Sequence, residues 1–503
     1  MYIAPNTTVI LYKNCPLDKS YNDTIYFASV SAQTAYFQTL TGYAFTGNSY
    51  QRVNSNKIRV AMNAESLYNC NYLAFQNASF GTKWFYAFIN SVDYINNVTS
   101  EITYEIDVIQ TWHFDYLLRQ CLIERAHTLT DGIGDNLVPE NLELGDYVST
   151  SSGTIAGLHN LSIVVAATFD ANYDNSPGAK YGGIYSGLLY HTFSNDDTGI
   201  AACQNFISGA VSEGKVNGIV SVFLMPTATV TNAGGAVTGG THTIAKLDHT
   251  ALDGYLPRNK KLYTYPFNFL YVTNMQGNAA AYHYEYFSTT DCQFQYGGDM
   301  SPNPSVVLTP KNYKGEAYNW DEKMVLSGYP QLSYNTDSFK AWLAQNGASL
   351  AVNAISTAGT AIANPIAGAI GAAGIVAQVY ERSIMPNQAH GGAGSTTNCA
   401  MGMQNFYIMQ KHIRGEFAAI IDKYFDMFGY ALHQVGIPAR DARPEWTYIK
   451  TIGCKIDPTA TSGLPGDDMV KIENIYNNGI RWWKTAAHIG NYSYSNAPVT
   501  HDT

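Results

Sequence analysis

The spacing of hydrophobic residues predicts that the first part of the chain is mostly β-strand. Apolar and polar residues alternate over 57–62, 83–89 and 101–108, which is the period-two pattern of a strand with two different faces. From residue 101 onward one face is apolar and the other is acidic. The acidic face carries Glu101, Glu105 and Asp107.

Helical spacing occurs in four places. In the clearest, apolar residues recur at i, i+3, i+4, i+7, i+8 and i+11 from Phe417 to Phe428, and Gly429 follows where such a helix can end. Ser31 is a candidate N-cap for a short helix near the N-terminus. The predicted helices span 31–40, 197–213, 417–428 and 467–478.

Changes in these patterns divide the chain into a first domain and an insertion. A loop rich in Gly and Pro precedes a new set of apolar strand-like runs at 161–169 and 216–225, and a Thr/Gly-rich stretch at 227–243 indicates a flexible loop or hairpin. Strand character returns at 261–273 and 282–287. We therefore expect a mainly β (α+β) protein with a first domain at 1–147, an inserted outer domain at 148–255, a continuation of the first domain at 256–340, an apolar loop at 341–395 and a C-terminal part of the first domain at 396–503.

The segment 341–380 contains no Asp, Glu, Lys or Arg over forty residues. Its most apolar part, 361–377, is interrupted by Pro365 and is shorter than the roughly 20 residues that a helix needs to cross a bilayer. Three interpretations remain open: a buried helical hairpin in a core, a linker without fixed structure, or a loop that enters a membrane conditionally. The residues that would enter lipid are Leu343, Leu350, Val352, Ile355, Ile362, Pro365, Ile366, Ile370, Ile375, Val376 and Val379.

Composition narrows the class of protein. The net charge is −10 and only 14% of residues are charged, whereas 38 are Tyr. A protein that grips a nucleic-acid backbone needs clustered Lys and Arg, so this class is excluded. The seven scattered cysteines predict buried thiols rather than a disulfide framework or a zinc site. The first residues show no secretory leader, so we expect synthesis in a reducing compartment such as the cytoplasm.

Candidate chemistry is sparse. His113 and Asp115 could form an orienting pair, and Asp131 and Asp135 flank two glycines and could bind a cation, but structural roles are more common for such residues. No nucleotide-binding loop, zinc-protease motif or nucleophile elbow is present. We therefore expect no enzyme activity, no catalytic residue, no cofactor and no metal.

Several sequence segments together resemble the tail knob or distal tail-tube proteins of small short-tailed phages of Gram-positive bacteria, the Salasmaviridae and picovirus type. They occur in the same order and span most of the chain, except for the insertion. The segments are FQNASFGTKWFYAF (75–88), EIDVIQTW (105–112), KLYTYPF (261–267), YPQLSYNTDSFKAWLAQN (329–346), KYFDMFGY (423–430) and NNGIRWW followed by HIGNY (477–492).

The resemblance implies a β-rich subunit of a hexameric ring at the distal end of the virion tail. It also implies that the loop at 341–395 plugs the tube and later enters the host cytoplasmic membrane as a channel for the genome. Expected partners are other copies of the chain, a lower collar and a tip protein, and phage DNA that passes without specific binding. In such a ring Glu101, Glu105 and Asp107 are candidates to line the lumen, where carboxylates repel DNA. The alternative is a tail protein that degrades cell wall or binds a glycan or receptor.

Overall fold

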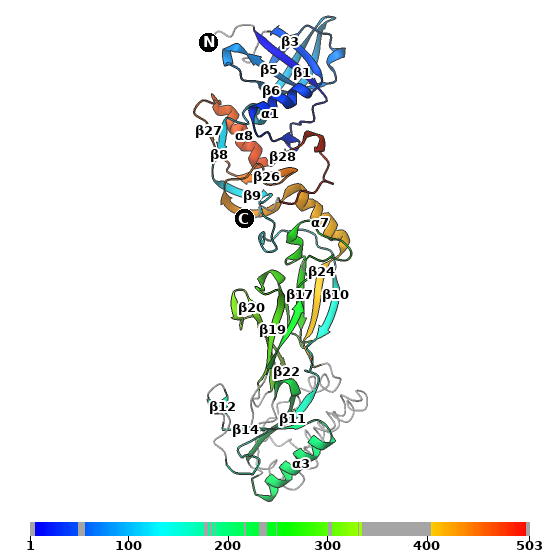
Figure 1. Ribbon diagram of the computed structural model, residues 1–503, viewed down its shortest axis with the longest axis vertical. Helices are drawn as coiled ribbons and strands as arrows, with labels where there is room; N and C mark the ends of the chain where they lie inside the picture. Colours follow the sequence, from blue (N-terminus) through cyan, green and yellow to red (C-terminus); the bar gives the residue numbers. More distant parts are fainter. Residues whose placement is uncertain are drawn as a thin grey trace, which may run out of the picture. The chain divides into compact units, whose positions relative to one another are not determined.

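The computed structural model describes residues 6–48, 56–175, 180–181, 184–185, 187–215, 218–230, 239–247, 249–299, 304–329, 331–333 and 404–498. The chain forms two compact units (Figure 1). Unit 1 combines Met1–Leu144, Tyr255–Leu262 and Gly415–Thr503, and unit 2 combines Gly145–Gly254 and Tyr263–Arg414. Both are built mainly from strands, so the predicted fold class is confirmed.

Unit 1 contains a six-stranded and a five-stranded sheet, a short two-stranded ladder and four α-helices in its described residues. The strand orders are β3-β1-β5-β6-β7-β4, β2-β28-β26-β9-β25 and β27-β8. The strands are β1 (Thr7–Lys13), β2 (Thr24–Ile25), β3 (Gly42–Asn48), β4 (Lys57–Val60), β5 (Cys70–Asn77), β6 (Phe85–Asn96), β7 (Thr99–Ile106), β8 (Tyr116–Leu118), β9 (Cys121–Ala126), β25 (Tyr430–Gly436), β26 (Trp446–Ile452), β27 (Ile456–Pro458) and β28 (Ile480–Trp483). The helices are α1 (Val30–Thr39), α2 (Val108–Thr111), α7 (Gly415–Phe428) and α8 (Gly466–Asn478).

Both faces of the six-stranded sheet are covered where β6 begins. Phe85 and Ala87 pack into one apolar cluster, and Tyr86 and Phe88 pack into another around Phe37 of α1. The first of these clusters also contains residues of α8 and β28, so the N-terminal and C-terminal parts of the chain share one core. This explains why the alternating pattern at 83–89 has large apolar side chains on both sides.

The helix ends follow the sequence closely. Gly429 ends α7 with φ +63°, and a Cβ there would lie 2.3 Å from backbone atoms of Ala126, so only glycine fits. At the N-terminus the prediction is wrong by two residues. Ser29, not Ser31, is the N-cap of α1, and its hydroxyl accepts a hydrogen bond from the Ala32 N–H at 3.2 Å.

In the part of unit 2 that the structure describes, several small sheets and the long helix α3 surround a shared core. In the described residues its sheets have the orders β10-β24-β17-β18, β14-β11-β15-β23, β12-β13 and β16-β19-β20-β21, with β22 paired to β20. The elements are β10 (Tyr147–Thr154), β11 (Leu161–Ala167), β12 (Lys180–Tyr181), β13 (Ile184–Tyr185), β14 (Leu189–Ser194), α3 (Asp197–Ser212), β15 (Ile219–Pro226), β16 (Gly239–Ala245), β17 (Asn268–Thr273), β18 (Ala279–Tyr282), β19 (Asp291–Asp299), β20 (Ser305–Tyr313), β21 (Glu316–Tyr318), β22 (Met324–Ser327), β23 (Gln331–Ser333) and β24 (Tyr407–Ile413).

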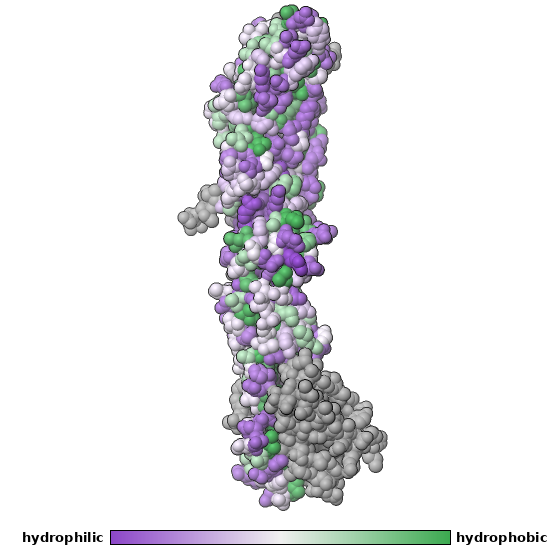
Figure 2. All heavy atoms as spheres, turned by 90° about the vertical axis from the view of Figure 1, so that its right-hand side faces the viewer, coloured by the Kyte–Doolittle hydropathy of each residue, from purple (hydrophilic) through white to green (hydrophobic). Residues whose placement is uncertain are grey.

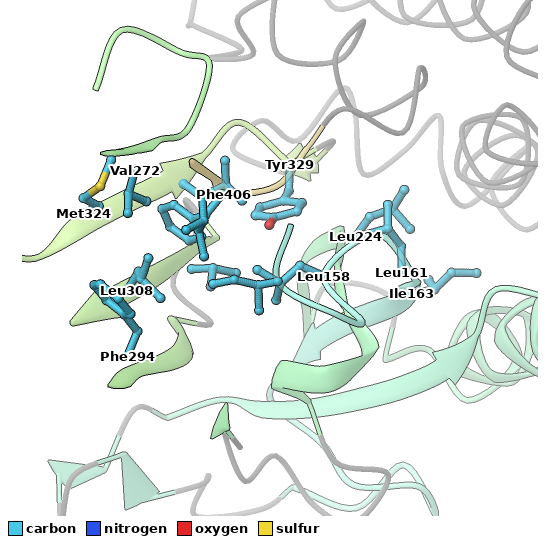
Figure 3. Packing of buried hydrophobic residues seen from close by; sticks show 14 of the residues in the cluster. Leu158, Leu161, Ile163, Leu224, Val272, Phe294, Leu308, Met324, Tyr329 and Phe406 are labelled. Atoms are coloured by element: carbon cyan, nitrogen blue, oxygen red, sulfur yellow. The ribbon is translucent and has the colours of Figure 1, made fainter. Parts of the chain in front are cut away.

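One apolar cluster runs through unit 2 (Figure 3). It joins Ile163 and Leu224 of the sheet under α3 to Val272, Leu308 and Phe406 of the other sheets. The predicted insertion and the predicted continuation of the first domain thus share a core. The two compact units therefore divide the chain differently from the predicted domains, because only 255–262 and 415–503 return to unit 1.

The returning stretch 255–262 is fixed in unit 1 by a buried carboxylate of α7. Asp422 accepts hydrogen bonds from the Tyr255 hydroxyl at 2.7 Å and from the backbone N–H groups of Arg258 and Asn259 at 2.8 and 2.9 Å. The Asn259 side chain bonds both Asp422 and Asp426. These bonds satisfy backbone groups that burial would otherwise leave unpaired.

Two strand predictions and one loop prediction need correction. The run 261–273 is extended only over β17, because its start forms a 3₁₀ turn at Lys260–Tyr263, and 282–287 is mostly a second 3₁₀ turn at Tyr284–Tyr286. The stretch 227–243 contributes the start of β16, which pairs with β19 in a regular ladder. Aromatic residues raise strand propensity but do not distinguish a strand from a packed turn.

Candidate functional site

The outward face of β7 carries two of the three predicted carboxylates. Ser100, Ile102 and Tyr104 point into unit 1, whereas Glu101 and Glu105 point outward, as the alternation predicts. The Glu105 side chain is 57% exposed and the Glu101 side chain is 17% exposed. The neighbouring strand β4 causes this difference, since it places two cations beside Glu101.

Ion pairs neutralise this face. Lys57 Nζ lies 2.7 Å from Glu101 Oε1, and Arg59 Nε lies 3.0 Å from Oε2. Hydrogen bonds from Lys57 and Arg59 hold the pKa of Glu101 below its ordinary value. Lys19 Nζ lies 3.4 Å from Glu105 Oε2, and Asp93 of β6 stands opposite Glu101. The predicted acidic face is therefore charged but balanced, with three carboxylates beside three cations.

Asp107 is not part of this face. The strand ends at Ile106, and Asp107 is the N-cap of α2, where its carboxylate accepts from the N–H groups of Ile109 and Gln110 at 3.1 and 3.0 Å. The Tyr72 hydroxyl also donates to it at 2.8 Å. Asp107 is only 2% exposed, and burial raises its pKa to about 6. This buried cap cannot line a lumen in the described conformation, so its assignment is corrected.

The candidate acid/base pair is not assembled. The Nε2 atom of His113 lies 2.8 Å from the Phe27 carbonyl oxygen, and burial lowers the His113 pKa to about 4. Asp115 instead accepts a hydrogen bond from Lys83, whose ammonium also lies 3.5 Å from the Trp112 ring centroid. Both residues serve the packing of unit 1, and nothing in this arrangement activates a nucleophile.

The candidate cation ligands are each held by other partners. Asp131 accepts from the Tyr430 hydroxyl at 2.7 Å and from the Lys260 N–H at 3.2 Å, whereas Asp135 closes a turn by accepting from the Gly132 N–H. Among the described residues, no group of three or more His, Cys, Asp or Glu side chains is arranged to hold a metal ion.

The apolar segment lies outside the described residues, together with all eleven residues predicted to enter lipid. The strands that flank it belong to unit 2. β23 pairs with β15, with Ser333 opposite Ser221, and β24 lies between β10 and β17. In the part of the chain that the structure describes, no helix combines the length and apolarity needed to span a bilayer.

A row of exposed aliphatic side chains crosses the five-stranded sheet of unit 1. Leu122 of β9 stands opposite Val435 of the edge strand β25 on one side and Ile452 of β26 on the other. Their exposed fractions are 36%, 72% and 53%. Sequence reasoning missed this row, because the three residues are far apart in the chain and only the strand register aligns them.

On the face shown in Figure 2, hydrophobic residues lie among hydrophilic ones, as is usual for the surface of a soluble domain. The balanced charges on β7 and the aliphatic row are two surface features of unit 1 that call for a role.

Comparison with known proteins identifies the family. The family described as Bacillus phage phi29 tail knob protein gp9, C-terminal domain, matches residues 235–497, more than half of the chain. The chain belongs to this tail knob family. A second match, to the N-terminus of the caudoviral major tail protein, covers residues 5–117 and so includes the whole six-stranded sheet. The predicted resemblance is confirmed, and the protein is a structural component of a phage tail.

Individual relatives match the sequence over nearly the whole chain. Tail knob protein gp9 of Bacillus phage PZA is 24% identical, and gp9 of Bacillus phages phi29 and B103 is 22% identical; each match covers 97% of this chain and 98% of the relative. The tail knob protein gp12 of bacteriophage C1 shares the fold, with a TM-score of 0.62 at 14% identity over 96% of this chain and 98% of that one.

Proposed function

We propose that the protein forms a homohexameric tube at the distal end of the virion tail and conducts the genome during ejection. In this proposal the segment 341–395 plugs the tube and then enters the host cytoplasmic membrane to form a channel. The observation that carries it is an uncharged stretch of forty residues in a tail knob protein. Water is a poor final environment for its aliphatic residues, each of which gains about 1.5–3 kcal/mol on burial.

The position of the flanking strands supports a loop that can be released. β23 is an edge strand of its sheet and β24 is an inner strand of another. Because both strands are paired with other parts of unit 2, the intervening segment can leave a tube without unravelling the sheets that hold its ends. This is the arrangement that a conditional membrane loop requires.

The balanced charges on β7 support a passage that does not bind DNA. We propose that Glu101 and Glu105 face the lumen together with their cationic neighbours. A surface with no net charge gives phosphate groups little electrostatic attraction, so DNA can slide past it. The proposed partners are further copies of the chain, a lower collar protein and a tip protein, the host membrane, and phage DNA without sequence preference.

The membrane step is tested with liposomes and two matched double variants of the full chain. Ile366→Asp with Ile370→Asp places two charges in the apolar segment, each costing about 2.5–3.5 kcal/mol at a bilayer centre, whereas Ile366→Val with Ile370→Val keeps it apolar. We expect dye release with the wild type and the Val pair and strong loss with the Asp pair. Equal release by both pairs would contradict the proposal.

The tube itself is tested by electron microscopy of the purified protein. Six-fold rings with a central opening are the expected result, and monomers at every concentration would contradict it. The alternative function, degradation of cell wall or binding of glycans, predicts clearing of host walls in a zymogram or retention on wall polysaccharide. Because His113 and Asp115 have separate partners, we expect no clearing.

A further inference from the structure

Two free thiols of unit 1, Cys121 and Cys454, meet where two antiparallel ladders adjoin. The β9–β26 ladder ends at the pair Leu122–Ile452, and the β8–β27 ladder ends at the pair Leu118–Ile456. Between them the Arg119 N–H donates to the Lys455 carbonyl oxygen at 2.9 Å. The two ladders have the same strand register. Continuing that register across the residues between them places Cys121 opposite Gly453 and next to Cys454.

Both thiols point into the interior. Cys121 is 5% exposed and Cys454 is 1% exposed, and Cys454 packs in the main apolar cluster of unit 1. Gly453 has φ +68°, a backbone turn that allows the side chain after it to lie on the same side as Cys121. The Asn477 side chain of α8 fixes this turn by accepting from the Cys454 N–H at 3.0 Å.

The two side chains are close enough for a covalent link. Cys454 follows the residue opposite Cys121 in the ladder, and the two thiols are joined by a side-chain hydrogen bond. Each thiol is also an interaction partner of the other: burial and then Cys121 raise the pKa of Cys454 to about 12, and burial raises the pKa of Cys121. The two groups therefore keep their protons at neutral pH and react slowly.

We propose that Cys121 and Cys454 form a disulfide after the assembled protein leaves the reducing cytoplasm. The oxidant is a small-molecule disulfide. The Cys121 thiolate, the more exposed of the two, attacks it and releases one small thiol; the Cys454 thiolate then displaces the second small thiol, and the protein S–S bond forms. Both cysteines are oxidised, the reagent's S–S bond is reduced to two thiols, and the two cysteine protons end on those thiols.

The link would join the two ladders covalently. It would connect the end of the N-terminal part of unit 1 with its C-terminal part, which strand pairing and a shared apolar core hold together. Slow reaction favours assembly with free thiols followed by locking in the extracellular medium. The protein would then be more resistant to unfolding outside the cell than during assembly.

The experiment uses full-length protein in a Cys399→Ser background, which removes the cysteine outside the described residues and leaves the six described ones. Reduced protein is incubated with oxidised glutathione, denatured, alkylated and mapped by mass spectrometry. We expect the number of free thiols to fall from six to four, with one linked peptide pair that contains residues 121 and 454. The thermal midpoint of unit 1 should rise by about 5–10 °C.

Two further variants separate the link from general effects of cysteine loss. Cys121→Ser should abolish both the linked peptide and the rise in midpoint, whereas Cys203→Ser, at a buried position of unit 2, should keep both. If the reduced Cys121→Ser protein has the same thermal midpoint as the reduced wild type, the substitution leaves the fold intact. Six free thiols after prolonged oxidation, or glutathione adducts without the linked peptide, would overturn the proposal.

Discussion

Arg59 stands directly opposite Glu101 in the antiparallel ladder of β4 and β7, and its Nε lies 3.0 Å from Glu101 Oε2. Glu101 thus accepts from a cation on its own cross-strand neighbour as well as from Lys57. A carboxylate that appears in the sequence as part of an acidic row is therefore one half of a balanced surface. The outward face of β7 is therefore expected to interact weakly with a polyanion instead of repelling it.

Replacing the two outward carboxylates of β7 by lysine should make this face bind DNA. Glu101→Lys with Glu105→Lys leaves five cations beside Asp93, so we expect double-stranded DNA to be retained at low salt and released as salt rises. Retention is measured on assembled protein by filter binding. Glu143→Lys with Glu213→Lys changes the net charge equally at exposed positions elsewhere. Equal retention by both pairs would show that β7 does not face the passage.

A charge in the aliphatic row should prevent assembly without unfolding the subunit. Val435 is 72% exposed, so Val435→Asp should change the stability of the monomer by less than about 0.5 kcal/mol. If the row is buried between subunits, the same change should abolish rings in electron micrographs and shift the sedimentation profile to monomer. Val470→Asp, at an exposed position of α8, is the matched control and should assemble normally.

The contribution of Glu285 to the stability of unit 2 should fall as the pH rises toward neutrality. The Glu285 side chain is 2% exposed; its Oε1 accepts from the Tyr265 N–H at 3.1 Å, and its Oε2 has no hydrogen-bond partner among the described residues. Burial raises the Glu285 pKa to about 7. The folded state therefore holds a proton that the unfolded chain releases near pH 4.5, and this stabilisation is lost as the pH passes 7.

Denaturant titrations at pH 5 and pH 8 measure this effect. The Glu285 contribution should lower the free energy of unfolding by about 2–3 kcal/mol between these pH values. Glu285→Gln cannot ionise and should remove this part of the difference. The nearby His283 acts in the opposite direction, because burial lowers its pKa to about 4 and only the unfolded chain takes up its proton near pH 6.5; the comparison with Glu285→Gln leaves this contribution unchanged. An unchanged pH dependence in the Gln variant would contradict the assignment.

Gly429 and Gly463 offer a test of close packing at a left-handed backbone position. Their φ angles are +63° and +62°, but a Cβ at Gly429 would meet the backbone of Ala126, whereas the space at Gly463 is open. Gly463→Ala should cost about 1–2 kcal/mol from backbone strain alone. Gly429→Ala should cost clearly more, because backbone must move. Equal unfolding midpoints for the two variants would contradict this reading of α7.

The sequence was informative where one element could be recognised by itself. The alternation at 101–106 correctly placed Glu101 and Glu105 on the outward face, and the apolar spacing before Gly429 correctly placed α7. In both cases burial of one side of a single element determines the pattern. The six cysteines that the structure describes are buried thiols, as their scattered positions predicted.

The sequence predictions were wrong where the role of a residue depends on contacts with residues from other parts of the chain. Asp107 continues the alternation in the sequence, yet it caps α2, because Tyr72 and two backbone N–H groups reach it there. The neutralising role of Arg59 and the row around Leu122 both depend on strand register, which one sequence does not reveal. For the same reason the shared core of unit 2 could not be anticipated, and the domain boundaries were placed differently.

The division of the chain also constrains the order of folding. The described core of unit 2 ends at Ile408, whereas the core of unit 1 needs Ile472, Tyr476 and Trp482. During synthesis, unit 2 can complete its packing while the six-stranded sheet made first still lacks the residues that cover it. The earliest part of the polypeptide is thus the last to become stable, and a nascent chain stalled near residue 450 would expose its unfinished sheet to chaperones.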